Sequence, residues 1–118
     1  MQYTWLKKSE SNDLIIFYSG WGMASTSVSL DVGAYNLLVF SDYRDIAIPE
    51  ALREEINTYK TIFVVAWSLG IVPAVLNKQL FNVTKFVAVN GSLFPSDDRY
   101  GIPEAYPLNG YWRFNAIK

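Results

Sequence analysis

Short, uninterrupted hydrophobic runs recur along the chain, and each run ends in a segment that is polar or contains glycine. Runs of this kind, rich in β-branched and aromatic residues, are typical of strands that are buried on both faces of a sheet. They predict four buried strands, over residues 14–18, 36–40, 61–66 and 85–89. An antiparallel edge strand is expected over residues 3–8, whereas residues 24–33 fit either a poorly formed helix or a loop.

Two segments between these strands have helical patterns. Residues 49–57 begin with proline and acidic residues and place Leu52 and Ile56 on one face, as in an amphipathic helix. Residues 70–80 are apolar and long enough for a second helix. The alternation of strand and helix predicts an α/β fold, with a predominantly parallel sheet and right-handed crossover helices. A single domain over residues 1–118 is expected, with an irregular, proline-interrupted tail over residues 94–118.

The composition limits the available chemistry. The 118 residues are 51% hydrophobic, which is enough for one core. The net charge of -1 and the pI near 5.3 argue against nucleic acid or an anionic membrane as a partner. The chain has no cysteine and no histidine, so a structural zinc is excluded and no metal site is expected. No run approaches the roughly 20 apolar residues that span a bilayer, and no signal peptide is recognisable, so a cytoplasmic location is expected.

A serine lies between the third predicted strand and the second predicted helix, in the segment VVAWSLG at residues 64–70. Ligands of parallel sheets bind beyond the carboxyl ends of the strands. A nucleophilic serine on a tight turn there needs small residues two positions before and after it, and Ala66 and Gly70 flank Ser68 in this way. The N–H of Leu69, at the start of the helix, would face a developing oxyanion. A serine that only caps the helix is the alternative.

Two further loops contain candidates for the same chemistry. The first predicted strand is followed by SGWG at residues 19–22, where the N–H of Trp21 is a candidate second oxyanion donor. Asp97 and Asp98 follow the fourth predicted strand and are candidates for the acid of a catalytic triad. Two solvated loop acids remain the alternative for this pair.

Two other features of the loops favour different roles. Asp42 and Asp45 lie on either side of Arg44 after the second predicted strand, which favours a loop network over catalysis. The segment 20–22 lacks the third glycine of a dinucleotide-binding loop and the Gly-Lys-Ser/Thr of a P-loop, so nucleotide binding is not predicted.

Taken in order, these motifs resemble the BioG-type pimeloyl-[acyl-carrier protein] methyl ester esterases of bacterial biotin synthesis, which are α/β-hydrolases. The matching segments are SGWGM (19–23), SDYRD (41–45), VVAWSLG (64–70), NGSLFPSDD (90–98) and YGIPEA (100–105). The resemblance implies hydrolysis of a small-molecule methyl ester carried on acyl-carrier protein, without a cofactor. It also implies Ser68 as the nucleophile, Trp21 and Leu69 at the oxyanion hole, and Asp97, with Asp98 behind it, as the acid.

The chain differs from that family in its length and in having no histidine. Members of the family are longer and carry their catalytic histidine near the C-terminal end. We therefore expect a truncated α/β-hydrolase fold with little activity, and copies that associate through an exposed sheet edge. A non-catalytic binding or assembly module on the same scaffold is the alternative.

Overall fold

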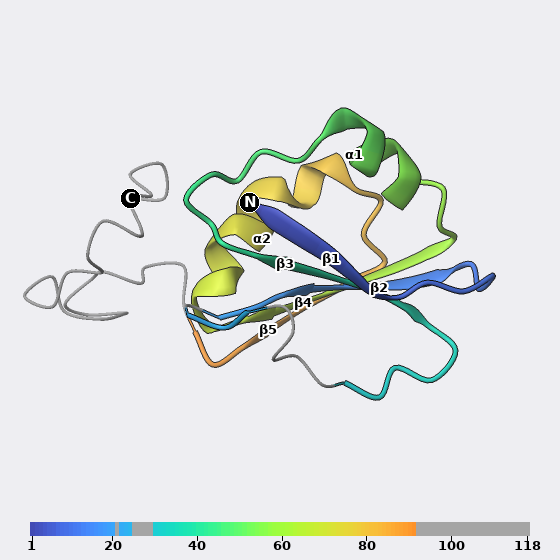
Figure 1. The fold of residues 1–118 in the computed structure, drawn as a ribbon, viewed down its shortest axis with the longest axis horizontal. Coiled ribbons are helices and arrows are strands. Elements are labelled where there is room, and N and C mark those ends of the chain that lie inside the picture. The colour runs from blue at the N-terminus through green and yellow to red at the C-terminus, as the bar shows by residue number, and fades with distance from the viewer. Residues whose placement is uncertain (21, 25–29, 92–118) are drawn as a thin grey trace, which may run out of the picture.

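The computed structural model describes residues 1–20, 22–24 and 30–91, which form a mixed five-stranded sheet of order β1-β3-β2-β4-β5 (Figure 1). The strands are β1 (Gln2–Lys7), β2 (Asp13–Tyr18), β3 (Asn36–Ser41), β4 (Thr61–Trp67) and β5 (Lys85–Val89). Strand β1 is antiparallel to β3, whereas the β2–β3, β2–β4 and β4–β5 pairs are parallel. The predicted strands, including the antiparallel edge strand, are confirmed to within one residue at each end.

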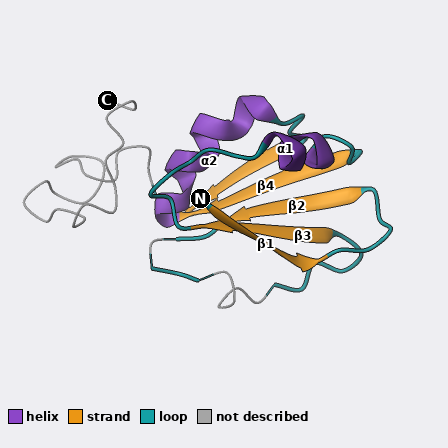
Figure 2. Cartoon of the chain, turned by 45° about the horizontal axis from the view of Figure 1, so that its top comes forward, coloured by secondary structure: helices purple, strands orange, loops and turns teal. Residues whose placement is uncertain are grey.

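Two α-helices lie on the same side of the sheet (Figure 2). Helix α1 (Glu50–Ile56) confirms the amphipathic helix predicted between the second and third strands. The predicted second helix is divided into a 3-10 turn η2 (Ser68–Gly70), helix α2 (Ile71–Asn77) and a 3-10 turn η3 (Lys78–Leu80). The helices and the sheet together confirm the α/β class. In the segment left open by the sequence, residues 24 and 30–33 form no helix.

The main core lies between the helices and one face of the sheet. Side chains alternate between the two faces along a strand, so every second residue points toward the helices. The sheet contributes Leu14, Ile16, Tyr18, Leu38, Phe40, Ile62, Val64 and Ala66 to this core, and the helices contribute Leu52, Ile56, Ile71 and Ala74. A smaller cluster on the opposite face contains Phe17, Leu37 and Val39, covered in part by Met23 and Val32. The central strands β2 and β3 are thereby buried on both faces.

Strand β5 is much less buried than the sequence pattern predicts. Within the described residues it pairs only with β4, so its outer edge has no neighbouring strand. Val87 of β5 is 39% exposed and Trp67, at the end of β4, is 37% exposed. The prediction of a fully buried fourth strand is therefore wrong, because a hydrophobic run does not reveal whether anything lies beside it.

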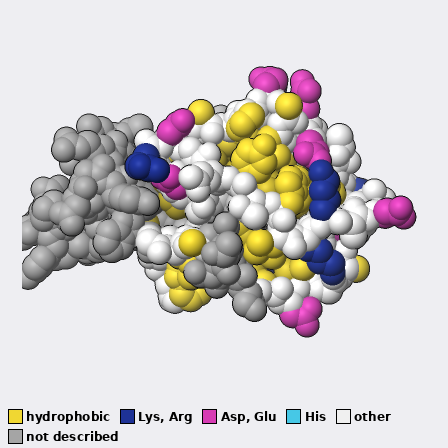
Figure 3. Space-filling model, viewed as in Figure 1, with side chains coloured by type: hydrophobic (Ala, Val, Ile, Leu, Met, Phe, Trp, Pro, Cys, Tyr) yellow, Lys and Arg dark blue, Asp and Glu magenta, His cyan; other side chains and the backbone are white. Residues whose placement is uncertain are grey.

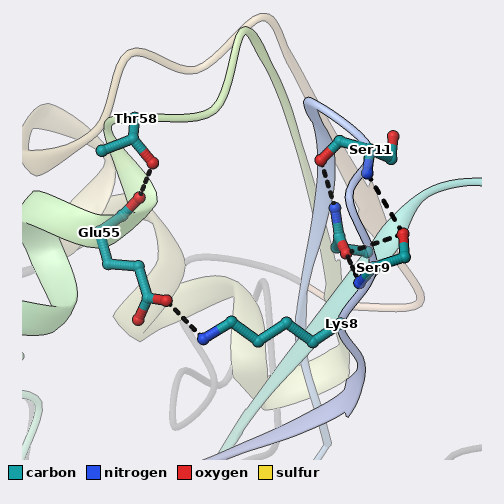
Figure 4. A network of polar contacts seen from close by, with 6 residues as sticks. Lys8, Ser9, Ser11, Glu55 and Thr58 are labelled. Atoms are coloured by element: carbon teal, nitrogen blue, oxygen red, sulfur yellow. Dashed lines mark hydrogen bonds and ion pairs between the residues drawn. The ribbon is translucent and has the colours of Figure 1, made fainter.

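A buried asparagine fixes the sheet at the end opposite the carboxyl ends of its parallel strands. The side-chain amide of Asn36 donates to the carbonyl oxygens of Ser11 (2.9 Å) and Asp13 (3.0 Å), and its oxygen accepts from the Ser9 N–H. Beside this network, the Lys8 ammonium donates to the Glu55 carboxylate of α1 at 2.6 Å (Figure 4). The turn between β1 and β2 is thus joined to both β3 and α1.

The surface seen in Figure 3 is mixed in character. Acidic and basic side chains are scattered over this face, and hydrophobic side chains reach the surface between them. None of the helices among the described residues has the length and hydrophobicity needed to cross a membrane.

Candidate active site

The carboxyl ends of β2, β3, β4 and β5 meet at one edge of the sheet because these strands run parallel. All of the described non-glycine residues with positive φ lie at this edge, each directly after a strand: Asp42 (φ 58°), Ser68 (φ 54°) and Asn90 (φ 54°). The left-handed conformation costs roughly 1–2 kcal/mol for most residues with a Cβ, but aspartate and asparagine adopt it more readily, so the cost falls mainly on Ser68. Strained backbone of this kind concentrates at functional sites. The edge predicted to carry the site is therefore also the edge where the backbone is strained.

Ser68 lies at an abrupt junction between strand and helix. Trp67 has extended angles (φ -108°, ψ 126°), Ser68 has a positive φ, and Gly70 is already helical (φ -64°, ψ -16°). Trp67 and Gly70 occupy the N-cap positions of η2 and α2, and neither helix start has a side-chain capping hydrogen bond. The geometry thus lacks the contact that a capping serine would make. It has a sharp turn from strand to helix over Trp67–Gly70, here called the elbow.

Gly70 shows why a small residue is needed two positions after Ser68. A Cβ atom there would lie 2.5 Å from the carbonyl oxygens of both Tyr18 and Ser19 at the end of β2. A larger residue would push the elbow away from β2. Ala66, two positions before Ser68, is fully buried under the helices. Both small residues singled out in the sequence therefore lie where space is restricted.

Two further glycines pack directly against the elbow. A Cβ atom at Gly91, in the turn after β5, would lie 2.5 Å from the carbonyl oxygen of Ser68. A Cβ atom at Gly20, in the loop after β2, would lie 2.9 Å from the Trp67 ring and 3.5 Å from the Ser68 Cβ. The loops from both neighbouring strands thus meet at Ser68. This role of Gly91 was not predicted from the sequence, although an Asn-Gly pair directly after a strand marks a tight turn.

The other predicted site residues divide into two groups. Leu69 follows Ser68 in η2, and its side chain is buried in the core on the helix side of the sheet. Its N–H belongs to the first turn of a helix, where amides have no acceptor within the helix. Trp21, Asp97 and Asp98 lie outside the described residues, so the second oxyanion donor and the triad acid stay predictions.

The loop after β3 contains the ionic contact expected there. The Asp42 carboxylate accepts hydrogen bonds from the Arg44 guanidinium, at 2.7 Å from Nε and also from Nη2. This contact holds the pKa of Asp42 below its ordinary value. Asp45 instead accepts from the backbone N–H of Ala47 at 2.7 Å. Asp42 therefore takes part in the loop network that the sequence predicted for it.

Residues 1–111 match a family model described as pimeloyl-ACP methyl esterase BioG. The chain belongs to the BioG family. The resemblance drawn from the ordered motifs is thereby confirmed. The BioG match includes the strands, the elbow at Ser68 and the loops that pack against it.

The chain is also similar to two curated proteins and to one crystal structure. The chain is 35% identical over 96 residues to a malonyl-[acyl-carrier protein] O-methyltransferase of Bacteroides fragilis, covering 79% of this chain and 19% of the relative. It is 34% identical over 98 residues to an uncharacterised protein of Haemophilus influenzae, and the match covers 81% of this chain and 44% of that protein. The crystal structure of BioG from Haemophilus influenzae matches with a TM-score of 0.75 at 30% identity, over 89% of this chain and 48% of that one. The chain therefore spans less than half the length of these relatives.

Proposed function

We propose that this chain carries the nucleophile and oxyanion loops of a serine carboxylic-ester hydrolase with a truncated α/β-hydrolase fold. The observation that carries the proposal is the positive φ of Ser68 at the turn from β4 into η2, with Gly20 and Gly91 packed against it. A substrate consistent with the BioG family is the methyl ester of a pimeloyl chain on acyl-carrier protein, whose hydrolysis frees a carboxylate for biotin synthesis.

In this proposal the Ser68 hydroxyl attacks the ester carbonyl and gives its proton to a general base. The base then protonates the departing methoxide, so methanol leaves and an acyl-serine remains. Water attacks the acyl-serine with help from the same base, which releases the carboxylate and restores Ser68. The N–H groups of Leu69 and Trp21 would stabilise the oxyanion of both tetrahedral intermediates, and Asp97 would orient the base.

These 118 residues contain no histidine, so they do not supply a histidine base. Enzymes that lose a member of the triad keep a residual rate of roughly 10³ to 10⁴ over water from the oxyanion hole and from binding. Turnover by this chain alone is therefore expected to be weak, and most of it should survive the loss of Ser68.

Imidazole in solution can replace the missing base and so test the proposal. The hydrolysis of p-nitrophenyl butyrate is measured for the wild-type chain and for Ser68→Ala over a series of imidazole concentrations. Ser68→Ala corrects for hydrolysis by imidazole itself. We expect the difference between the two proteins to grow with imidazole. Equal rates for both proteins at every concentration would refute a nucleophilic Ser68 and favour a non-catalytic binding module.

A further inference from the structure

Tyr43, in the loop after β3, places its hydroxyl between the ends of two strands. The hydroxyl lies 2.7 Å from the carbonyl oxygen of Ser19 and 2.9 Å from that of Phe40. It has one proton, so it donates to one of these oxygens at a time. Burial raises the pKa of Tyr43, which keeps the hydroxyl protonated and able to donate at neutral pH. The tyrosine therefore connects the loop after β3 to the residue that begins the loop after β2.

The carbonyl group of Ser19 also faces the elbow. Its oxygen would lie 2.5 Å from a Cβ at Gly70, so this oxygen occupies the space between the Tyr43 hydroxyl and the backbone of Gly70. The peptide unit that joins Ser19 to Gly20 is planar, so the direction of the carbonyl also sets the direction of the Gly20 N–H. Gly20 is in turn the loop residue that lies against Ser68.

The Ser19 side chain and the Met23 backbone make further hydrogen bonds in this loop. The Ser19 hydroxyl lies 3.0 Å from the carbonyl oxygen of Phe40 and 3.2 Å from that of Met23. The Met23 N–H donates to the carbonyl oxygen of Gly20 at 3.2 Å and closes a turn. A change in the orientation of the Ser19–Gly20 peptide would therefore disturb the Met23 hydrogen bond as well as the contact with Ser68.

We propose that Tyr43 is a positioning residue of the Ser68 site, whose hydroxyl holds the Ser19–Gly20 peptide against the elbow. Tyr43 acts on Ser68 through the loop after β2. The expected effect on the reactivity of Ser68 rests on the proposed function. The structural part of the inference, the position of the loop, is measurable without any reaction.

The test compares Tyr43→Phe with two control variants. Tyr18→Phe removes a hydroxyl from the adjacent buried tyrosine, whose ring centroid is 6.3 Å from that of Tyr43. Within the described residues the Tyr18 hydroxyl makes no hydrogen bond. Burial raises the pKa of Tyr18, and the nearby Asn77 side chain opposes this rise. Ile56→Val is a core truncation in α1, and it controls for a general loss of stability.

Two quantities are measured for each protein: the hydrogen-exchange rate of the Met23 amide by NMR, and the rate at which a fluorophosphonate labels Ser68. We expect Tyr43→Phe to accelerate the exchange and to slow the labelling, each by about tenfold, the effect of one hydrogen bond. Both controls should leave the two quantities within about twofold of wild type, since neither removes a bond to this loop. Ser19→Ala, which removes the second support of the loop, should change both quantities in the same direction as Tyr43→Phe.

The outcomes separate this inference from the proposed function. Unchanged Met23 exchange in both Tyr43→Phe and Ser19→Ala would overturn the inference, whatever the labelling shows. Wild-type labelling rates in these two variants would also overturn it. A wild-type chain that fails to label at Ser68, but whose Met23 exchange responds to Tyr43→Phe, would instead refute the proposed function and retain the positioning of the loop. Equal changes in Ile56→Val would reduce Tyr43 to a purely structural residue and contradict the inference.

Discussion

The backbone of Gly91 lies directly against that of Ser68: a Cβ atom at Gly91 would be 2.5 Å from the Ser68 carbonyl oxygen and 2.8 Å from its Cα. Atoms do not approach this closely without displacement, so the turn after β5 limits where the elbow can lie. The two residues belong to neighbouring strands, and their contact depends on the β4–β5 pairing. On the β5 side, Ser68 is thus held by backbone atoms, which move less easily than a side chain would.

Gly91→Ala is expected to displace the elbow. The added methyl should cost about 1–3 kcal/mol of stability, the typical effect of overpacking, and should slow fluorophosphonate labelling of Ser68. Gly33→Ala is the matched control, because Gly33 has a positive φ (56°) but open space around its Cβ position. It should lose stability through backbone strain and label at the wild-type rate. Denaturant unfolding and labelling kinetics measure both effects, and equal labelling rates for the two variants would contradict the contact.

The strain at Ser68 should be visible as a difference in stability. Ser68→Gly removes the penalty of the left-handed conformation, whereas Ser68→Ala retains a Cβ and therefore the penalty. The glycine variant should be more stable than the alanine variant by about 1 kcal/mol. This is the conformational penalty that is removed, less the extra chain entropy that glycine loses on folding. Urea unfolding measures this difference. An alanine variant as stable as the glycine variant would mean that Ser68 does not hold a left-handed conformation.

The ion pair of Asp42 with Arg44 should make stability depend on pH. The pKa of Asp42 is lowered in the folded state, so its stabilisation is present above the unfolded pKa of about 3.9 and is lost as the pH falls through the lower folded value. Asp42→Asn tests this, because asparagine tolerates the positive φ at this position. The variant should be less stable than wild type by under about 1 kcal/mol at pH 7 and equal to it near pH 2. An unchanged difference at both pH values would exclude the ion pair as its cause.

The edge of β5 that no described strand covers should mediate self-association. Val87 is 39% exposed on this edge strand, and a lysine there would place a charge against any pairing strand. Val87→Lys should weaken the association seen by analytical ultracentrifugation by about tenfold or more, equivalent to ~1.4 kcal/mol. Tyr3→Lys, at a residue 44% exposed on β1 at the opposite edge, should have no such effect. A wild-type chain that is monomeric at all concentrations, or equal effects of both variants, would contradict association through β5.

The sequence predicted the elements of the fold well, and it predicted poorly how those elements are covered. Apolar runs rich in β-branched residues located the strands, and the proline-led pattern before Leu52 located α1, since these signals are local. The half-exposed state of Val87 was not predictable, because burial depends on what lies beside a strand. The division of the second helix into η2, α2 and η3 was also missed, since apolar length does not distinguish a continuous helix from a segmented one.

The same limit applies to the candidate site. Ser68, Ala66 and Gly70 were identifiable because an elbow needs these residue types at fixed spacing. Gly91 and Tyr43 were not assigned to the site, because their contacts join residues more than twenty positions apart and exist only once the strand order is established. Sequence spacing thus pointed to Ser68 as the candidate nucleophile, whereas only the structure shows which residues pack against it.

The most direct test of the central claim is the site at which a fluorophosphonate reacts. The wild-type chain and Ser68→Ala are treated with the reagent, and the adducts are located by intact mass and by peptide mapping. We expect a single predominant adduct on Ser68 in the wild-type chain and none in Ser68→Ala, since Ser68 is the one serine with a positive φ among the described residues and is followed by the proposed oxyanion donor Leu69. Adducts distributed over several serines, or an adduct that persists unchanged in Ser68→Ala, would contradict a nucleophile at the elbow.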